Sequence, residues 1–376
     1  ALVHNGSALF TGDAGQGESN IRRWVLENDW LEAIIALPLN IFYNTGIATY
    51  IWVLANKKAE ARRGKVQLID ASDWFQPLRR NLGKKNCELS DGDIQRIIDL
   101  YLGEAQETAE SKWFDTQDFG YWKITVERPL RLNFAVTDER IKRFQISPFF
   151  ESMAISLKRK NKAKIEEEVL EGKAAQAAIL AVLQAMQPAF ADGKLVKDRK
   201  VFEAQLSDAF KAADLTLDVP LKTALLAPGG LGEKDPSAEI CRDKKGNPEP
   251  DADLRDTENV PLPADIALPL PLDYEGKKNK GKVDVEPLLK LVRAHCEAYL
   301  EAEVLPYRPD AWIDHSKTKV GYEIPFNRHF YVFEPPRPLA DIDADLAEVT
   351  ARIQAMLKGL TAGSGIQRIR IAASSG

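Results

Sequence analysis

The hydrophobic pattern of the first 72 residues changes between helical and strand periods. Residues 18–28 carry apolar side chains at helical spacing behind an acidic first turn, whereas 31–37 and 47–54 are continuous apolar runs of strand length. A third run of this kind covers 66–69. Because uninterrupted apolar strands require a sheet that is covered on both faces, the pattern predicts an α/β protein.

The remaining pattern predicts more helix than strand. A capped helix is expected over 90–102, with Ser90 or Asp91 as its N-cap. Strand patterns cover 119–134 and 320–333, and helical patterns cover 138–227 and 285–300. Nine of the 21 prolines fall within 220–271, which predicts a long irregular connection there.

The last helix has the most regular periodicity in the sequence. Alternating spacings of three and four separate its apolar residues, which are Leu339, Ile342, Leu346, Val349, Ile353, Met356 and Leu360. They form an a/d seam of about three heptads, long enough to pair with another helix. An amphipathic helix packed on its own domain explains the same spacing. The pattern favours the partner helix only slightly.

Composition limits the classes of protein that remain. A length of 376 residues predicts about two or three domains, and a net charge of −5 excludes a strongly basic nucleic-acid binder, so any DNA contact must be local. The apolar runs are shorter than the roughly 20 residues of a transmembrane helix, and we expect no membrane contact. Three scattered cysteines, Cys87, Cys241 and Cys296, argue for a reducing, cytoplasmic location.

Two familiar kinds of site have little support. The Gly-rich segment 12–17 precedes a helix, where backbone amides attract anions, but it lacks both Gly-Lys-Ser/Thr and the Gly-x-Gly-x-x-Gly spacing. A flexible surface loop is the favoured interpretation. The four histidines form no i, i+4 pair and no Cys-x-x-Cys accompanies them, so no metal site is predicted.

Residues 40–49 are the most informative candidate site. They lie between two apolar strands, where strand ends open onto a cleft in α/β sheets. Phe42 and Tyr43, followed by Asn44-Thr45-Gly46, place a π surface beside hydrogen-bonding groups, as a pocket for a planar base requires. A hairpin whose aromatics cap the core explains the same residues. Taken alone, the pattern favours that second interpretation.

A resemblance to a known family changes this weighting. Segments in the right order along nearly the whole chain resemble the rear of the methyltransferase core and the region C-terminal to that core in modification (M) subunits of type I restriction-modification systems. These segments are 4–12, 18–24, 31–38 (Leu-Glu-Ala-Ile-Ile-Ala-Leu-Pro), 42–49 (Phe-Tyr-Asn-Thr-Gly-Ile-Ala-Thr), 119–121, 126–131, 238–243, 254–261, 310–314, 321–331 and 335–339.

The resemblance implies a chemistry and a set of partners. Such subunits transfer a methyl group from S-adenosylmethionine to the exocyclic amine of an adenine that is flipped out of the DNA. Phe42 matches the aromatic beside that base, Tyr43 is next to it, and Thr45 and Gly46 match the turn that shapes this wall. The implied partners are DNA, the specificity subunit, a second modification subunit and the restriction subunit.

The resemblance also implies an architecture. We expect the C-terminal strands of a Rossmann-like methyltransferase sheet, then a mainly α-helical domain and a C-terminal heptad helix. The expected parts are the rear of the methyltransferase core (1–75), a connecting helix and strand region (76–135), a mainly helical domain with a Pro-rich loop at 228–272 (136–334), and a partner-binding helix and tail (335–376).

The chain departs from the family pattern in several ways. It contains neither the Gly-rich S-adenosylmethionine loop nor the catalytic Asn-Pro-Pro-aromatic motif, which 247–250 and 334–337 only imitate. Because the first ten residues resemble the end of a strand and its loop, we expect the sequence to start inside a domain, with most cofactor contacts upstream. The stretch 267–298 suggests an insertion. The chain alone is expected to be inactive, and a non-catalytic helical interaction module remains the alternative.

Two basic clusters are the candidates for contact with DNA phosphates. The first contains Lys158, Arg159 and Lys160, followed by Lys162 and Lys164, and the second contains Arg128 and Arg131, followed by Arg140, Lys142 and Arg143. Since three glutamates at 166–168 come after the first cluster, a solvated helix face is the favoured explanation of that run.

Overall fold

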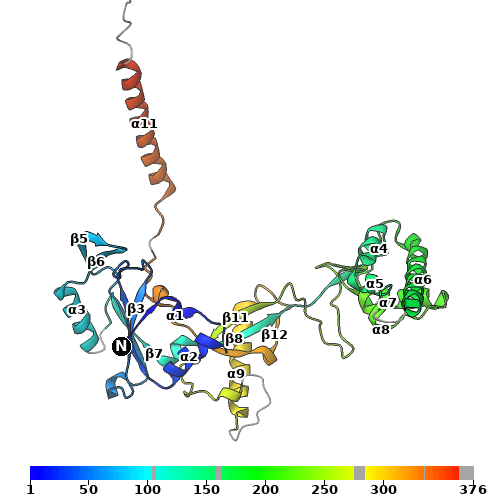
Figure 1. Cartoon of the computed structure of the whole chain (residues 1–376), viewed down its shortest axis with the longest axis horizontal. Helices are drawn as coiled ribbons and strands as arrows, with labels where there is room; N and C mark the ends of the chain where they lie inside the picture. The colour runs from blue at the N-terminus through cyan, green and yellow to red at the C-terminus, as the bar shows by residue number, and fades with distance from the viewer. Residues whose placement is uncertain (104–106, 157–161, 275–283, 334, 364–376) are drawn as a thin grey trace, which may run out of the picture. The chain divides into compact units, whose positions relative to one another are not determined.

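The computed structural model describes residues 1–103, 107–156, 162–274, 284–333 and 335–363 (Figure 1). Two compact units make up the chain, Ala1–Pro325 and Phe326–Gly376. Helices and strands follow one another along the first unit. The predicted mixture of α and β structure is therefore confirmed.

The first unit begins with a five-stranded sheet. Its strands, in spatial order, are β1 (Leu2–Asn5), β3 (Thr49–Leu54), β2 (Leu31–Leu37), β4 (Lys65–Asp70) and β7 (Ser111–Asp115). β2 and β4 pair in parallel, and the other neighbours are antiparallel. The apolar runs at 31–37, 47–54 and 66–69 therefore form strands as predicted, and central β2 is buried along almost its whole length.

The described residues of this part of the chain form three α-helices: α1 (Ser7–Phe10), α2 (Gly17–Glu27) and α3 (Asp91–Leu102). The start of α3 is the predicted one, because the Ser90 hydroxyl accepts the Asp93 N–H and the Asp93 carboxylate accepts the Ser90 N–H. Ile97 of α3 packs into the hydrophobic cluster of the first sheet. α1 ends just before the Gly-rich segment 12–17, for which the sequence predicts a surface loop.

A second sheet is built around β8 (Gly120–Glu127), which is buried at almost every position. β8 pairs antiparallel with β11 (Asp256–Pro261), β12 (Trp312–Ile313) and β13 (Lys319–Tyr322). β11 corrects the expected irregular loop at 228–272. Its four polar residues, 256–259, show no apolar strand pattern, so only the hydrogen bonds to β8 make it a strand.

α2 fastens the two sheets to each other. The buried Arg22 donates from Nε to the Tyr322 carbonyl at 2.7 Å and from Nη2 to the Thr11 carbonyl at 2.7 Å. Glu27 accepts from Arg23 Nε and from the Tyr322 hydroxyl, both at 3.1 Å. Because these polar groups satisfy one another inside the protein, the joint between the sheets is fixed.

Further elements of the first unit lie outside these two sheets. They are η1 (Glu60–Arg62), the hairpin strands β5 (Gln76–Leu82) and β6 (Lys85–Glu88), η2 (Thr116–Phe119), η4 (Leu272–Tyr274), α9 (Glu286–Tyr299), the π-helical η5 (Leu300–Val304) and η6 (His315–Lys317). α9 confirms the helix that the sequence predicts over 285–300.

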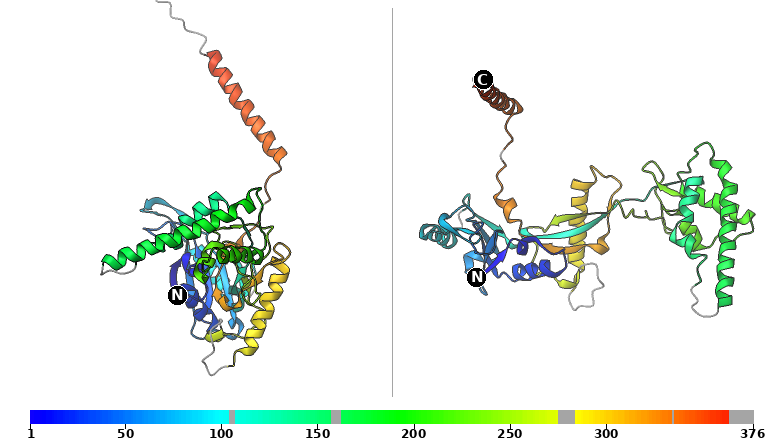
Figure 2. Two further views of the ribbon diagram at one scale, coloured as in Figure 1. Left: turned by 90° about the vertical axis from the view of Figure 1, so that its right-hand side faces the viewer. Right: turned by 45° about the horizontal axis from the view of Figure 1, so that its top comes forward.

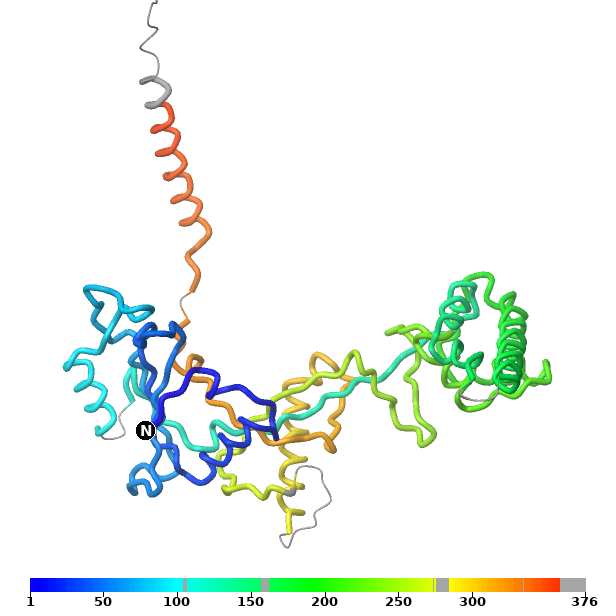
Figure 3. Tube along the Cα trace, in the orientation of Figure 1, coloured from blue at the N-terminus to red at the C-terminus, as the bar shows by residue number. Residues whose placement is uncertain are grey.

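Residues 128–255, here called the helical lobe, leave β8 and return at β11. The lobe contains β9 (Leu132–Phe134), α4 (Asp138–Gln145), α5 (Pro148–Ser152), α6 (Lys162–Met186), η3 (Gln187–Phe190), α7 (Arg199–Ala212), α8 (Val219–Leu226) and β10 (Gly232–Lys234). The segment that leaves β8 and the segment that leads into β11 run side by side (Figure 3). They are joined by bridges such as the one between Pro129 and Pro250. The mainly helical part predicted for 136–334 is thus shorter than expected, because β11, β12 and β13 return to β8.

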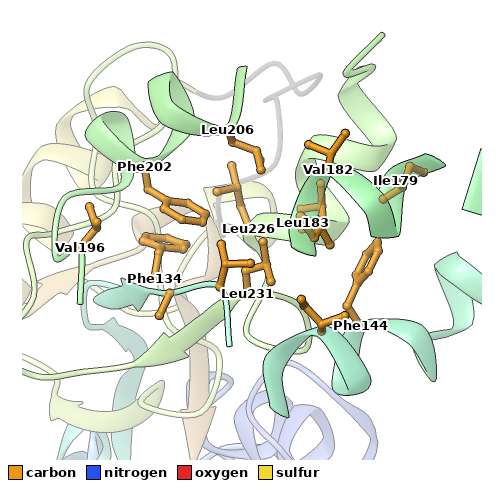
Figure 4. Close-up of a cluster of buried hydrophobic side chains, with 14 of the residues drawn as sticks. Phe134, Phe144, Ile179, Val182, Leu183, Val196, Phe202, Leu206, Leu226 and Leu231 are labelled. Carbon is orange, nitrogen blue, oxygen red and sulfur yellow. The ribbon is translucent and has the colours of Figure 1, made fainter. Parts of the chain in front are cut away.

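The helical lobe has a hydrophobic core of its own. Phe134 and Phe202 stack at its centre with ring centroids 4.9 Å apart (Figure 4). Side chains from α4, α5, α6, α7 and α8 belong to the same cluster, among them Phe144, Leu183 and Leu226. Since this cluster draws only on residues between 130 and 241, its hydrophobic stabilisation acts within the lobe.

α6 is the longest helix of the lobe and extends beyond its neighbours (Figure 2). Together with η3 it is long and apolar enough to cross a membrane by length and composition. Ile179, Val182 and Leu183 of α6 are nevertheless buried in the core of the lobe. The absence of membrane contact stays a prediction.

The described residues of the second unit form α10 (Phe326–Phe330) and α11 (Leu339–Gly363). α10 lies where the sequence pattern predicted a strand through residue 333, and Phe326 and Phe330 stack within it at 4.9 Å. α11 covers the heptad helix. Five seam residues, from Leu339 to Met356, are 49% to 78% exposed, Ile342 is half-buried, and the side chain of Leu360 lies outside the described residues.

Candidate functional site

Three strands of the first sheet end at the same edge. β1, β2 and β4 run in one direction, because β1 and β2 both pair antiparallel with β3 while β2 and β4 are parallel. Their last residues are Asn5, Leu37 and Asp70. Ligands of open α/β sheets bind outside the carboxyl ends of the strands, so this edge is the place where a site is expected.

The four predicted base-pocket residues lie together at this edge, in residues 39–48, here called the aromatic turn. Phe42 is 39% exposed and Tyr43 is 58% exposed, so neither ring caps the core. Phe42 and Thr45 form a bridge across the turn. Gly46 leaves room for Asn40, because a Cβ there would lie 2.7 Å from Asn40 Oδ1. The turn presents two aromatic rings beside polar groups.

The hairpin of β5 and β6 holds the aromatic turn in place. The Lys84 N–H donates to the Tyr43 carbonyl at 2.9 Å, and the Asn86 N–H donates to the Asn40 carbonyl at 3.1 Å. The buried Cys87 thiol donates to the Leu39 carbonyl at 3.1 Å, and burial raises its pKa. Three contacts from one hairpin thus fix the backbone of the turn.

The tip of the hairpin fits closely against the turn. Leu82 and Lys85 are paired, so Gly83 and Lys84 form a two-residue connection. Gly83 has φ +65°, and a Cβ at this position would lie 2.8 Å from the Tyr43 carbonyl oxygen. A glycine is required here both by the backbone conformation and by the close approach.

The hairpin also carries cations that the sequence analysis did not select. Arg79, Arg80 and Lys84 are exposed, and Lys85 is half-buried. In the described part of the chain, no carboxylate forms an ion pair with any of the four. Their signal in the sequence is two pairs of basic residues on either side of a glycine, but nothing there indicates that they lie beside the aromatic turn.

Four of the arginines that are predicted to contact DNA lie beside carboxylates of this chain. Arg128 and Arg131 lie 3.3 and 3.7 Å from the carboxylate oxygens of Asp310. Arg140 and Arg143 share Glu233 at 2.5 and 2.9 Å, and the Arg143 hydrogen bond lowers the pKa of that carboxyl. The first pair connects the start of the lobe to Asp310 outside it, and the second pair connects α4 to β10 within the lobe. Their assignment to DNA stays a prediction.

The other predicted cluster is only partly described. Lys158, Arg159 and Lys160 lie outside the described residues. Lys162 and Lys164 are exposed in the first turn of α6, and Lys142 is exposed on α4. Contact between this cluster and DNA stays a prediction.

The Gly-rich segment 12–17 is attached to the second sheet. Asp13 pairs with Lys123 of β8 at 2.5 Å and with Lys319 of β13 at 3.9 Å, and the hydrogen bond from Lys123 lowers the pKa of Asp13. A carboxylate at this position repels anions and occupies the nearby cations. Among the described residues, no group of three or more His, Cys, Asp or Glu side chains is arranged to hold a metal ion.

Residues 1–121 match the family described as N-6 DNA Methylase. The matched range contains the first sheet, the aromatic turn and the basic hairpin. The match ends at the second residue of β8, before the helical lobe begins.

Particular relatives point in the same direction. The MjaVII methylase subunit of a type I restriction enzyme from Methanocaldococcus jannaschii is 36% identical over 102 residues, which are 27% of this chain and 16% of the relative. The MjaIX methylase subunit from the same organism is 27% identical over 165 residues, 43% of this chain and 28% of the relative. The MpnII methylase subunit from Mycoplasma pneumoniae is 35% identical over 95 residues, which are 25% of this chain and 16% of the relative.

One solved structure is also similar in sequence. It is the methyltransferase subunit of a type I restriction-modification system from Streptococcus thermophilus, 28% identical, with 31% of this chain and 23% of that chain covered and a TM-score of 0.26. The chain spans between 16% and 28% of the length of the three methylase subunits described above. The resemblance to modification subunits of type I systems is confirmed.

Proposed function

We propose that the chain is part of a modification subunit that methylates the exocyclic amine of adenine in DNA within a type I restriction-modification complex. The observation that carries the proposal is the N-6 DNA Methylase match over 1–121, which coincides with the sheet that holds the aromatic turn. The five-stranded sheet is then the C-terminal part of a Rossmann-like methyltransferase sheet.

The role proposed for the aromatic turn is to bind the flipped adenine. Phe42 and Tyr43 offer exposed π surfaces, and stacking on such surfaces contributes about 1–3 kcal/mol per base. Thr45 and Gly46 shape the turn that carries them. None of the four transfers a proton. Their contribution is to hold the base outside the duplex with its amine accessible.

S-Adenosylmethionine is the proposed methyl donor, since the family to which the relatives belong uses it. The described residues of this chain do not fit that cofactor. Their Gly-rich segment is attached to β8 and β13 by Asp13, and it lacks the Gly-x-Gly-x-x-Gly spacing. No step of the reaction is therefore assigned to residues near it, and cofactor contacts are proposed to come from outside this sequence.

The partners proposed from the relatives are DNA, the specificity subunit, a second modification subunit and the restriction subunit, in the cytoplasm. The exposed seam of α11 supports a contact with one of these proteins, because apolar side chains at heptad spacing are stabilised by a partner helix. The same seam favours the second candidate function, a non-catalytic interaction module. Deletion of 339–360 should weaken co-purification with the specificity subunit, and unchanged co-purification would remove this role.

The base-binding role is tested with Phe42→Ala in the complete protein. We expect methylation of adenine to fall about 5- to 150-fold, which corresponds to the loss of about 1–3 kcal/mol of stacking, while binding of S-adenosylmethionine is unchanged. Tyr307→Ala, which removes an exposed aromatic far along the chain, is the matched control. Equal losses of methylation and cofactor binding in Phe42→Ala would count against the base wall.

Catalysis by this chain alone is a separate question. The isolated 376-residue chain, incubated with DNA and S-adenosylmethionine, should transfer no methyl groups. Methyl transfer by the isolated chain would refute the proposal that its catalytic and cofactor residues lie elsewhere.

A further inference from the structure

We infer that the hairpin of β5 and β6 binds the DNA phosphates that flank the target base. The inference rests on the proposed function, because it assigns a second element to the same DNA complex. It does not rest on the role of any single aromatic residue.

The first argument is charge. Residues 76–88 contain Arg79, Arg80, Lys84 and Lys85 against one acid, Glu88, which gives +4 − 1 = +3. The whole chain has a net charge of −5, so the other residues together carry −8. Contact with phosphates depends on local positive charge. In an otherwise acidic chain, DNA binding is therefore favoured at a short segment with a net positive charge, such as 76–88.

The second argument is the state of these cations. Arg128, Arg131, Arg140 and Arg143 already lie beside carboxylates. The four hairpin cations have no such partner among the described residues and are largely exposed. An unpaired cation can neutralise a phosphate without first breaking an ion pair, and it then releases a condensed counterion from the DNA.

The third argument is position. Backbone hydrogen bonds from Lys84 and Asn86 attach the hairpin tip to the aromatic turn. A flipped nucleotide leaves the base stack by rotation about its backbone, so its flanking phosphates stay close to the base. A cationic hairpin fixed directly to the base wall therefore lies where those phosphates must pass.

The fourth argument is rigidity. Pro77 pairs with the buried Cys87 across the hairpin, and the Cys87 thiol is hydrogen-bonded to Leu39. The short connection at Gly83 and Lys84 leaves no long loop at the tip. Because the backbone is already ordered, binding a phosphate requires ordering only the cationic side chains.

The test measures how salt weakens binding of the 376-residue chain to a fluorescent DNA duplex. The test variant replaces Arg79, Arg80, Lys84 and Lys85 by Gln. These changes leave the backbone N–H groups that support the aromatic turn. The matched control replaces four exposed lysines of the lobe, Lys173, Lys194, Lys211 and Lys244, by Gln, which changes the net charge equally.

Between about 50 and 200 mM salt, each phosphate contact contributes about 0.9 to the slope of log K against log salt concentration. The hairpin variant should therefore lose up to about 3.6 from the magnitude of the slope, and its affinity at the lower salt concentration should fall about tenfold or more. The control should keep the slope. The single variant Lys84→Gln, with a loss of about 0.9, serves if the fourfold variant does not fold.

Several results would overturn the inference. They are an unchanged slope in the hairpin variant, equal changes in the hairpin and control variants, and no duplex binding by the unmodified chain. Loss of co-purification with the specificity subunit at an unchanged slope would identify a protein-binding surface instead. The proposed function fails by a different result, namely no adenine methylation by the complete protein with an intact hairpin.

Discussion

The hairpin beside the aromatic turn and the base of the helical lobe are both rich in arginine and lysine, but the cations differ in what they contact. At the base of the lobe, Arg128 and Arg131 lie beside Asp310, and inside the lobe Arg140 and Arg143 share Glu233. On the hairpin, Arg79, Arg80 and Lys84 are exposed and Lys85 is half-buried, and no carboxylate among the described residues forms an ion pair with them. A count of basic residues does not distinguish the two regions, whereas their ion pairs do.

The two regions also differ in how they are stabilised. The first sheet forms its buried cluster from β2, β4 and α3, and it is attached to β13 through α2. The helical lobe has a separate cluster around Phe134 and Phe202 and connects to β8 and β11 by two neighbouring segments. A region with its own core can lose stability without affecting the other, and this difference can be measured.

The largest expected effect comes from Phe202→Ala. It removes a fully buried ring that stacks on Phe134, and we expect the lobe to lose about 3–5 kcal/mol of unfolding free energy. All seven tryptophans lie outside the lobe, whereas the lobe contains the α-helices α4 to α8. The part of the far-ultraviolet helix signal that comes from the lobe should therefore be lost at a lower urea midpoint, while the tryptophan fluorescence midpoint stays in place.

Val201→Ala is the control for this variant. Val201 is the residue before Phe202 and is 48% exposed, so its truncation should change the unfolding free energy by only about 0.5 kcal/mol. Coincident shifts of both signals in Phe202→Ala would show that the lobe and the sheets unfold together, and the contrast between their cores would then have no energetic meaning.

The second largest effect is expected at the junction of the two regions. Glu127 at the end of β8 has a side chain only 2% exposed, and its Oε1 accepts from Arg255 Nε and Lys317 Nζ, both at 2.8 Å. Glu127→Gln removes the charge that both cations share, and we expect a loss of about 2 kcal/mol, seen as a lower urea midpoint of tryptophan fluorescence.

An exposed carboxylate provides the comparison for Glu127. Asp253 is 81% exposed and pairs with Lys234, so Asp253→Asn should cost less than about 1 kcal/mol. If the two variants lost the same stability, burial of Glu127 would not be the reason for its effect, and the junction would be no stronger than a surface ion pair.

The features that the sequence predicts correctly depend on short-range patterns. The run at 31–37 became β2 with the same bounds, and Ser90 caps α3, because apolar runs and caps act over a few neighbouring residues. The aromatic turn was also found, because Phe42 to Gly46 are adjacent in the sequence. The resemblance of the chain to modification subunits is the basis for the function proposed for this turn, which the pattern alone left open.

The features that the sequence missed depend on contacts between distant residues. Arg128 lies 182 positions from Asp310, and the hairpin meets the aromatic turn through residues about forty positions apart, such as Lys84 and Tyr43. No local pattern states which carboxylate neutralises which cation. β11 was missed for the same reason, since its polar residues become a strand only through hydrogen bonds to β8.

The smallest expected effect concerns Glu233 and depends on pH. The hydrogen bond from Arg143 and the charge of Arg140 lower its pKa below the ordinary value of a glutamate, so the ionised form is stabilised in the folded lobe. Such a group stabilises the fold above the pKa of the unfolded chain, about 4.3, and this contribution is lost as the pH falls through the lower folded pKa. Because Glu233 is partly exposed, we expect Glu233→Gln to cost about 1 kcal/mol of unfolding free energy at neutral pH.

The difference in unfolding free energy between Glu233→Gln and the unmodified chain, measured from urea midpoints of the helix signal, should shrink below about pH 4. A difference that stays constant from neutral to acid pH would mean that the two arginines do not depend on the Glu233 charge, and the distinction between paired cations in the lobe and unpaired cations on the hairpin would lose its electrostatic basis.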